Sequence, residues 1–592
     1  MSMRRTCLPI VFVFVSACLC AIVALRSRVV SANESLAADR PQSGWRGPAA
    51  VWLSPDGATL LTACEKSGTI VAIDTARREK TWELAIGKSL VAMAATTDGA
   101  TLVACDAAAN ELMVMDAGDG RCKVRSRVPV SARPAGVVLD ADGRRAWVTS
   151  KWSREVSRVD LAAGKVDQVV QLDFSPRNAA WLPDGRTLIV ADAFGGRFAL
   201  IDAASGRIVR DLSVPGHNVR GLALSPDGQN LLVSHMILTE SAATTRDNVF
   251  WGIVMTSNVR IVPITSLVDA TKNPVREAHT HFFGDPGNAA GDPGPLALLP
   301  DGTAIVTLSG VGEVAIGRFQ PFGFRRVHVG QRPVDLAVSP DRKRAYVANH
   351  NSDTISVVRI EDQSVEATIA LGPEPQWTLA EQGERLFYDA RQSLDGWFSC
   401  HSCHTDGHTN GQRADTFGDG SYGAPKNVLS LLGAASTGPW AWNGSKTKLA
   451  EQIHQSLAES MQSRSAPSGR SVAAIAAYLD SLPQPPIVAW QSADRAAIDR
   501  GGKVFAARGC ATCHEGPTYS STELFDVGID DGEGGNSKFN PPSLRGLAHS
   551  APYFHDGRAK LLEDVFREHR HRVRAELPDG ELRDLVAFLQ SL

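Results

Sequence analysis

Short apolar runs separated by tight polar turns recur at a steady interval along residues 45–372. Most of the turns end in Asp-Gly, several in Pro-Asp-Gly, where Pro presets φ and Gly tolerates a positive φ. Apolar runs flank each turn and two more close the unit, which predicts four short strands per repeat. The intervals between the turn aspartates are 42, 44, 42, 43, 74 and 40 residues. These aspartates are Asp56, Asp98, Asp142, Asp184, Asp227, Asp301 and Asp341.

A four-stranded unit repeated seven times is typical of a β-propeller, in which ring closure hides the sheet edges. The region resembles the YVTN-type propellers over its whole length, and this resemblance implies an all-β seven-bladed propeller at 45–372. The 74-residue interval places about thirty extra residues in blade five, within 239–294. A long insertion in a regular array is usually a functional loop or a cover.

Two Cys-x-x-Cys-His motifs lie in the C-terminal third of the chain. In this motif both thiols form thioethers to a porphyrin and the histidine binds the iron. A disulfide or zinc pair is the alternative, but zinc needs further ligands at matching spacings. We therefore predict two covalently bound haem c groups. The attachment residues and proximal ligands are Cys400, Cys403 and His404 for the first haem and Cys510, Cys513 and His514 for the second.

The two haem segments are copies of one pattern, because corresponding residues after each motif keep the same spacing. Residues 468–482 and 578–592 have helical apolar spacing and close the two copies. The proline-rich stretch at 483–486 breaks the first helix and marks a linker. The chain is therefore expected to be multidomain, with the propeller followed by two tandem all-α cytochrome c domains at 375–483 and 484–592.

The repeat also predicts which residues are the sixth iron ligands. Met461 lies seventeen residues before Tyr478, and the same count back from the matching Phe588 gives His571. Met and His both ligate iron in c-type haems, and Met raises the reduction potential. We predict His404/Met461 and His514/His571, with the first haem the more oxidising. His569 is the alternative for the second haem, and a basic helix face would explain both histidines without a ligand role.

The first residues carry arginines followed by an apolar run, which is typical of an export signal. Residues 1–32 are expected to be a cleaved signal peptide, with a retained N-terminal anchor or a lipidated form as alternatives. Each places the protein outside the cytoplasm, in the periplasm or exported, with membrane contact only through that segment. With 43% hydrophobic residues, 21% charged residues and a net charge of −3, the chain is neither disordered nor multi-spanning, and no nucleic-acid partner is expected.

Residues 375–592 resemble the bacterial dihaem cytochrome c peroxidase and MauG-like family, through LFYDARQSLDGWFSCHSCH, WNGSKTKLAEQ and PSLRGLAHSAPYFHDGRAKLLEDV. In that family one haem receives electrons and the other, with a displaceable His and a catalytic Glu, reacts with peroxide. The resemblance implies Glu459 as the catalytic residue. The segment that should bring the displaceable His, 417–427, has none, and Met461 would close the iron.

Two functions therefore stay open. The first is a secreted dihaem peroxidase-like oxidoreductase whose propeller binds substrate or a partner. The second is a non-catalytic electron-transfer module with the propeller as a docking scaffold. Both imply an electron-donor or acceptor protein, either a small cytochrome or a copper protein.

Other histidines and cysteines lie in the propeller. A metal site is a weaker third idea for the histidines, and we expect the mouth carrying His235 and His350, capped by the inserted loop, to face the haem segments. For the cysteines, buried free thiols are favoured over a disulfide between adjacent blades. The remaining residues of these two groups are His217, His279, His281, Cys64, Cys105 and Cys122.

Overall fold

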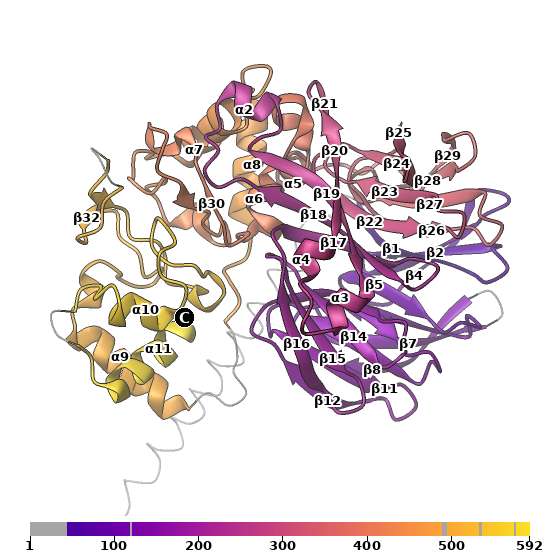
Figure 1. Ribbon diagram of the computed structural model, residues 1–592, viewed down its shortest axis with the longest axis horizontal. Coiled ribbons are helices and arrows are strands. Elements are labelled where there is room, and N and C mark those ends of the chain that lie inside the picture. Colours follow the sequence, from indigo (N-terminus) through magenta and orange to yellow (C-terminus); the bar gives the residue numbers. More distant parts are fainter. Residues whose placement is uncertain (1–43, 119–120, 488–493, 532–534, 574–575) are drawn as a thin grey trace, which may run out of the picture.

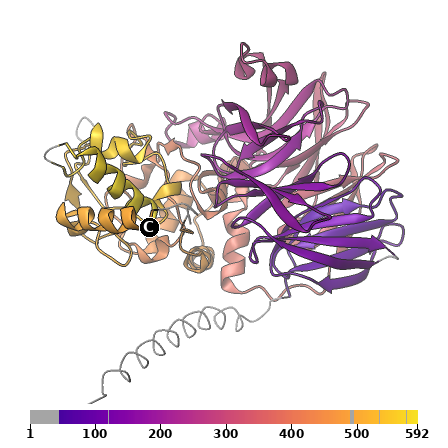
Figure 2. The same ribbon diagram turned by 90° about the horizontal axis from the view of Figure 1, so that it is seen from below.

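The computed structural model describes residues 44–118, 121–487, 494–531, 535–573 and 576–592. The expected export segment, 1–32, lies outside this part of the chain. Within the described ranges, no helix is both long enough and apolar enough to cross a membrane. The first two thirds of the chain consist mostly of strands and the last third mostly of helices, and the helical part lies to one side of the strands (Figure 1 and Figure 2).

Seven antiparallel sheets form a ring, which confirms the seven-bladed propeller. Each blade is one contiguous stretch of chain, and six blades have four strands while blade five has five. The first three blades consist of β1 (Pro48–Leu53), β2 (Thr59–Cys64), β3 (Thr69–Asp74), β4 (Glu79–Ala85), β5 (Leu90–Ala95), β6 (Thr101–Asp106), β7 (Glu111–Gly118), β8 (Arg121–Pro129), β9 (Pro134–Leu139), β10 (Arg145–Ser150), β11 (Glu155–Asp160) and β12 (Lys165–Gln171). The last four consist of β13 (Pro176–Trp181), β14 (Thr187–Asp192), β15 (Arg197–Asp202), β16 (Arg207–Ser213), β17 (His217–Leu224), β18 (Asn230–Leu238), β19 (Met255–Pro263), β20 (His279–Asp285), β21 (Asn288–Ala289), β22 (Pro293–Leu298), β23 (Ala304–Leu308), β24 (Glu313–Phe319), β25 (Phe322–His328), β26 (Pro333–Val338), β27 (Arg344–Asn349), β28 (Thr354–Arg359) and β29 (Ser364–Ala370).

The turns that mark the repeat join the first and second strands of each blade. In the first blade Gly57 has a φ of 73°, which only glycine adopts without strain. The Asp56 side chain accepts a hydrogen bond from the Ala58 amide at 3.0 Å, and the Gly57 amide donates to the Ser54 carbonyl at 2.8 Å. These local bonds hold the hairpin register, so the same short motif can start every blade.

Ring closure depends on packing between the first and last blades and needs no exchanged strand. Strand β1 lies against β26, and the Val51 amide donates to the Asp335 carboxylate at 2.8 Å. Burial raises the pKa of Asp335 to about 6. Trp45, just before β1, donates from its indole to the His350 carbonyl at 2.9 Å. The N-terminal end of the propeller is thus tied to the seventh blade.

The three propeller cysteines are free and buried, as expected. Burial raises the pKa of the Cys64 thiol to about 12 and that of Cys122 to about 11. Thiols in this state pack as small apolar groups and react slowly.

The insertion in blade five flanks a regular strand. One part precedes β19 and contains α2 (Arg246–Phe250), and the other follows it with α3 (Ile264–Val268) and α4 (Pro274–Glu277). The first part contacts the helical region: the Thr244 amide donates to the Asp415 carbonyl at 2.9 Å, and the Trp397 indole donates to the Phe250 carbonyl at 3.2 Å. Figure 1 shows α2 among the helices of that region. The expectation that the insert faces the haem segments is confirmed.

Two helix pairs organise the C-terminal third. Helix α5 (Leu379–Phe387) crosses α8 (Gly469–Ser481), and α9 (Arg495–Ala507) crosses α11 (Asp579–Gln590). Both predicted closing helices, α8 and α11, are present. A glycine lies at each crossing: a Cβ on Gly383 or Gly501 would lie 1.9 Å from a backbone carbonyl oxygen of the partner helix. The shorter helices between them are α6 (Cys400–Cys403), α7 (Leu449–Gln455) and α10 (Leu562–Arg567).

Replacing Gly501 by alanine should destabilise the second helix pair by about 1–3 kcal/mol, because the added methyl meets rigid backbone. The neighbouring Gly502→Ala is the matched control, since its Cβ would lie 3.4 Å from the Phe588 ring, an ordinary contact. That variant should be neutral or gain up to about 1 kcal/mol from helix propensity. Urea unfolding of the holoprotein measures both, and equal effects would contradict close packing at Gly501.

Candidate haem-binding sites

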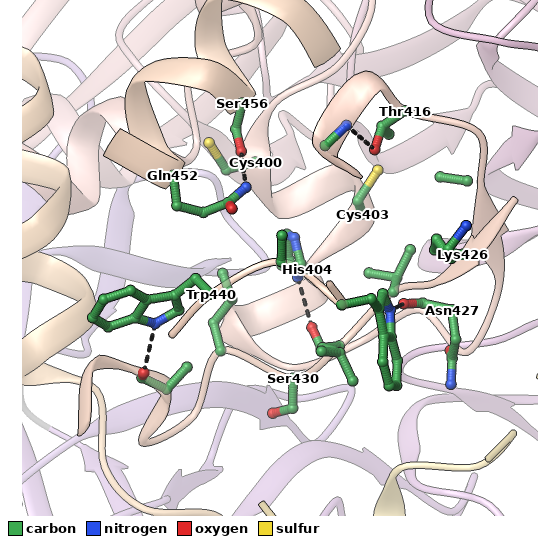
Figure 3. A pocket seen from close by; sticks show the side chains of 18 of the residues that line it. Cys400, Cys403, His404, Thr416, Lys426, Asn427, Ser430, Trp440, Gln452 and Ser456 are labelled. Atoms are coloured by element: carbon green, nitrogen blue, oxygen red, sulfur yellow. Dashed lines mark hydrogen bonds between the residues drawn. The ribbon is translucent and has the colours of Figure 1, made fainter. Parts of the chain in front are cut away.

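The first Cys-x-x-Cys-His motif forms one wall of a cavity of about 380 Å3. Helix α6 carries both cysteines, and its start is capped by Ser399, whose amide donates to the Ser402 hydroxyl at 2.8 Å. Cys400, Cys403 and His404 all line the cavity, and Figure 3 shows them around one open space. The short helix brings the two thiols and the imidazole to the same side, as covalent haem attachment requires.

His404 is oriented as an iron ligand. Its Nδ1 lies 2.8 Å from the Leu429 carbonyl oxygen, to which it donates, so Nε2 carries the free lone pair (Figure 3). Burial lowers the pKa of His404 to about 4 and keeps the ring neutral, the form that binds a metal. A backbone carbonyl on the second nitrogen is the usual partner of a metal-bound histidine. The residues at this site therefore fit a c-type haem.

Met461 lies at the same cavity, as the repeat count proposed. It follows an irregular helical turn, 456–460, and its sulfur lies 3.9 Å from the Cys400 sulfur. A second thioether, Met255 of strand β19, also lines the cavity and was missed by the sequence analysis, because nothing in its local sequence points to haem. Glu459 is exposed and is not part of the described lining, so the structure does not bring it to the cavity.

Three parts of the chain enclose this cavity. Blade five contributes Val254, at the end of the first part of its insert, and Met255, the first residue of β19. The first helical segment contributes Trp440 and Trp442, and the second contributes Phe554. The buried core around Met461 is likewise continuous with propeller residues such as Met255. The propeller is thus part of the wall of the first site and not a detached neighbour.

The histidine of the second motif has the same hydrogen-bond geometry. His514 Nδ1 lies 3.1 Å from the Tyr519 carbonyl oxygen, so its Nε2 is also free to bind iron. His571 packs edge-on against Phe554, with ring centroids 5.5 Å apart, and its buried Nδ1 has no hydrogen-bond partner in the described part of the chain. Burial, with a smaller effect of nearby His514, lowers the pKa of His571 to about 4.

His569 also packs against Phe554, at 5.5 Å, with its buried Nε2 unpartnered among the described residues. An imidazole nitrogen left without a partner suits a metal ligand, so both histidines fit the second haem.

The first motif also docks into one mouth of the propeller. Asp406, two residues after the motif, accepts ion pairs from Lys151, Arg177 and Arg220, each at 3.0 Å. These cations hold the pKa of Asp406 well below its usual value despite burial. His401, within the motif, has its Nε2 3.2 Å from an Arg220 nitrogen.

Two further bonds join the attachment helix to the propeller. Ser402 donates from its hydroxyl to Asp292 at 2.7 Å, and its carbonyl oxygen lies 2.9 Å from His217 Nε2. This contact was not predicted from the sequence, where its only signal is the polar pair His401-Ser402 between the two cysteines.

The metal alternative for the propeller histidines finds no support. The described residues contain no group of three or more His, Cys, Asp or Glu side chains that could hold an ion. His350 lies 3.0 Å from the Glu65 carboxylate, and His235 is 3.2 Å from the Met236 carbonyl oxygen. These histidines and His217 serve as hydrogen-bonded groups near the mouth that faces the cytochrome segment.

Comparison with known families supports both the propeller and the cytochrome segment. Residues 28–226 match the family model described as a YNCE-like beta-propeller, and residues 378–485 match the model for di-haem cytochrome c peroxidase. The chain thus joins a propeller similar to the first family to a segment similar to the second, which supports a peroxidase-like oxidoreductase with two c-type haems.

The relatives are distant. A cytochrome c551 peroxidase of Nitrosomonas europaea is 25% identical over 40% of this chain and 85% of its own length. The methylamine utilization protein MauG of Methylorubrum extorquens is 27% identical over 36% of this chain and 76% of its own. Among solved structures, a Kuenenia stuttgartiensis hydrazine synthase chain matches 54% of this chain and 98% of its own, with 23% identity and a TM-score of 0.48.

Proposed function

We propose that the protein is an exported dihaem oxidoreductase that exchanges electrons with a small cytochrome or copper protein in the periplasm, while its propeller binds substrate or a partner. The observation that carries this proposal is the pair of motif histidines, each hydrogen-bonded through Nδ1 to a backbone carbonyl. The residues around these histidines determine whether the iron can activate peroxide or can only exchange electrons.

We further propose that residues 375–483 and 484–592 are tandem cytochrome c domains behind a propeller at 45–372. The support is the equivalent helix crossing in each half, at Gly383 and at Gly501. The second half also has its own apolar core, which includes Phe505 and Leu585. A duplicated unit explains why both sites present the same histidine geometry.

The proposed axial pairs are His404/Met461 and His514/His571. Bound haem iron supplies one-electron redox chemistry, and peroxide activation where a coordination position is open. Met461 is buried beside Cys400 and would occupy that position at the first haem. The first haem should then have the higher reduction potential, because its partner has two imidazoles.

Electron transfer without peroxide chemistry is the second candidate function. It is favoured by the thioether in the first cavity and by the exposure of Glu459. Trp442 and Phe554 both line the first cavity, and Phe554 also contacts His571, so aromatic rings lie between the two sites. This placement suits electron transfer between the two haems.

Optical and EPR spectra of the as-isolated and half-reduced holoprotein, with and without peroxide, separate the two functions. Peroxidase chemistry requires a five-coordinate high-spin haem that responds to peroxide in one of these states. If both haems stay low-spin and ignore peroxide while a small cytochrome still reduces them, the protein is an electron-transfer module. Failure of a small cytochrome or copper protein to exchange electrons would overturn both proposals.

A further inference from the structure

The central channel of the propeller is a second cavity, of about 610 Å3. Small or apolar side chains of the inner strands, such as Ala92 and Ala179, form much of its wall. Tyr388 and His401 of the cytochrome segment line it as well, at the mouth where that segment docks. The cytochrome segment therefore covers this end of the channel.

Three guanidinium groups line the channel beside that end. Arg177 belongs to β13, Arg220 belongs to β17, and Arg332 immediately precedes β26. Burial, with Arg220 and Arg332 nearby, lowers the pKa of Arg177 to about 10. Like charges gathered out of bulk water are costly unless anions accompany them.

The carboxylates that line the channel are already hydrogen-bonded. Asp292 accepts from the Ser399 and Ser402 hydroxyls, at 2.5 and 2.7 Å. Asp335 accepts from the backbone amides of Val51 and Leu336, at 2.8 and 2.9 Å. Neither carboxylate is a hydrogen-bond partner of Arg177 or Arg332, whose nearest carboxylates are Asp406 and Glu384.

Arg177 and Arg332 each have guanidinium N–H groups that make no hydrogen bond within the described chain. Arg177 bonds Asp406 through Nη1 alone, at 3.0 Å, and shares that carboxylate with two other cations. Arg332 makes its polar contacts through Nη1, 3.4 Å from His350 Nδ1 and 3.7 Å from the Glu384 carboxylate, and the face of its guanidinium stacks on the Tyr388 ring at 3.4 Å. Within the described chain, Nε and Nη2 of both arginines have no hydrogen-bond partner. Together these four nitrogen atoms offer six N–H donors.

We propose that the channel binds a small oxyanion, either a carboxylate or an inorganic oxyanion, between Arg177 and Arg332. Two guanidinium forks suit an anion with at least two oxygen atoms. The ligand enters from the propeller mouth opposite the cytochrome segment, since that segment covers the near one. It lies beside His401, and so next to the haem-attachment helix. This site is independent of any peroxide chemistry.

The test is isothermal titration of the holoprotein at low ionic strength with malonate and, separately, with sulfate. At least one anion should bind saturably at one site per chain, and binding of malonate alone would identify a carboxylate ligand. Arg177→Gln should weaken binding at least about tenfold, because a charge-assisted hydrogen-bond pair is lost. Arg177→Lys, which keeps the charge toward Asp406, should also weaken it, by removing the fork.

The matched control is Arg125→Gln, since Arg125 pairs with Asp116 on the outer surface of the propeller and is 43% exposed. Its affinity should equal that of the unchanged protein. Thermal unfolding of each variant verifies that the fold is kept. The proposal is overturned if neither anion binds saturably, or if both Arg177 variants bind as tightly as the control.

Discussion

Met461→Ala should convert the first haem, and only the first, from six-coordinate low-spin to five-coordinate high-spin, so that half of the haem in the protein changes its spectrum. The sulfur of Met461 is buried beside Cys400, and alanine offers no replacement ligand. The reduction potential of that haem should fall because a thioether ligand raises it. Reactivity with added peroxide should appear at the same time. Optical and EPR spectra with a redox titration measure these changes.

Met255→Ala is the matched control for this experiment. Met255 is a buried thioether that lines the same cavity, so both variants lose about 2–5 kcal/mol of packing. Only replacement of the methionine that binds the iron should change the spin state of the haem. A spectral change in Met255→Ala alone would assign the sixth position to the propeller. No change in either variant would mean that neither methionine binds iron.

Asp406→Asn should lower the free energy of unfolding by about 3 kcal/mol, since it leaves the partly buried Lys151, Arg177 and Arg220 without their shared carboxylate. The pairing is well shielded, with the Asp406 side chain only 14% exposed. Because the first cytochrome segment and the propeller share an apolar core, the loss should appear in their common transition. Urea unfolding of the holoprotein, followed by tryptophan fluorescence, measures the effect.

Asp116→Asn provides the comparison, as Asp116 pairs with Arg125 at 2.9 Å on the propeller surface. Its side chain is 50% exposed, and such surface pairs contribute about 0–1 kcal/mol. If the two substitutions cost the same, Asp406 does not hold the segments together. A loss confined to Asp406→Asn supports the propeller as a structural part of the first haem site.

Features encoded within short stretches were predictable. The seven blades follow from a turn motif whose bonds, such as those around Asp56 and Gly57, are made within a few residues. The helices α8 and α11 follow from apolar spacing alone. The haem-attachment residues are contiguous by chemical necessity, because one short segment must present two thiols and an imidazole to the same porphyrin.

The contacts between the propeller and the cytochrome segment could not be predicted, because they join residues far apart in the chain. Arg220 meets Asp406 across 186 residues, and Lys151 meets it across 255. Neither contact has a local signature, because an arginine or lysine on a propeller strand usually lies in solvent. Likewise, no residue near Met255 in the sequence indicates that it lines the first cavity. Only the packing of blade five against the cytochrome segment brings it there.

The order of residues alone therefore determined a seven-bladed ring, two haem-attachment motifs and the helices that accompany them, since each depends on periodicity or on adjacency along the backbone. Tertiary structure decided that the first motif closes one mouth of the ring, that the insert lines its cavity and that Asp406 gathers three cations from different blades. Such contacts form only when closure of the ring brings distant strands together, because charge and packing act through space.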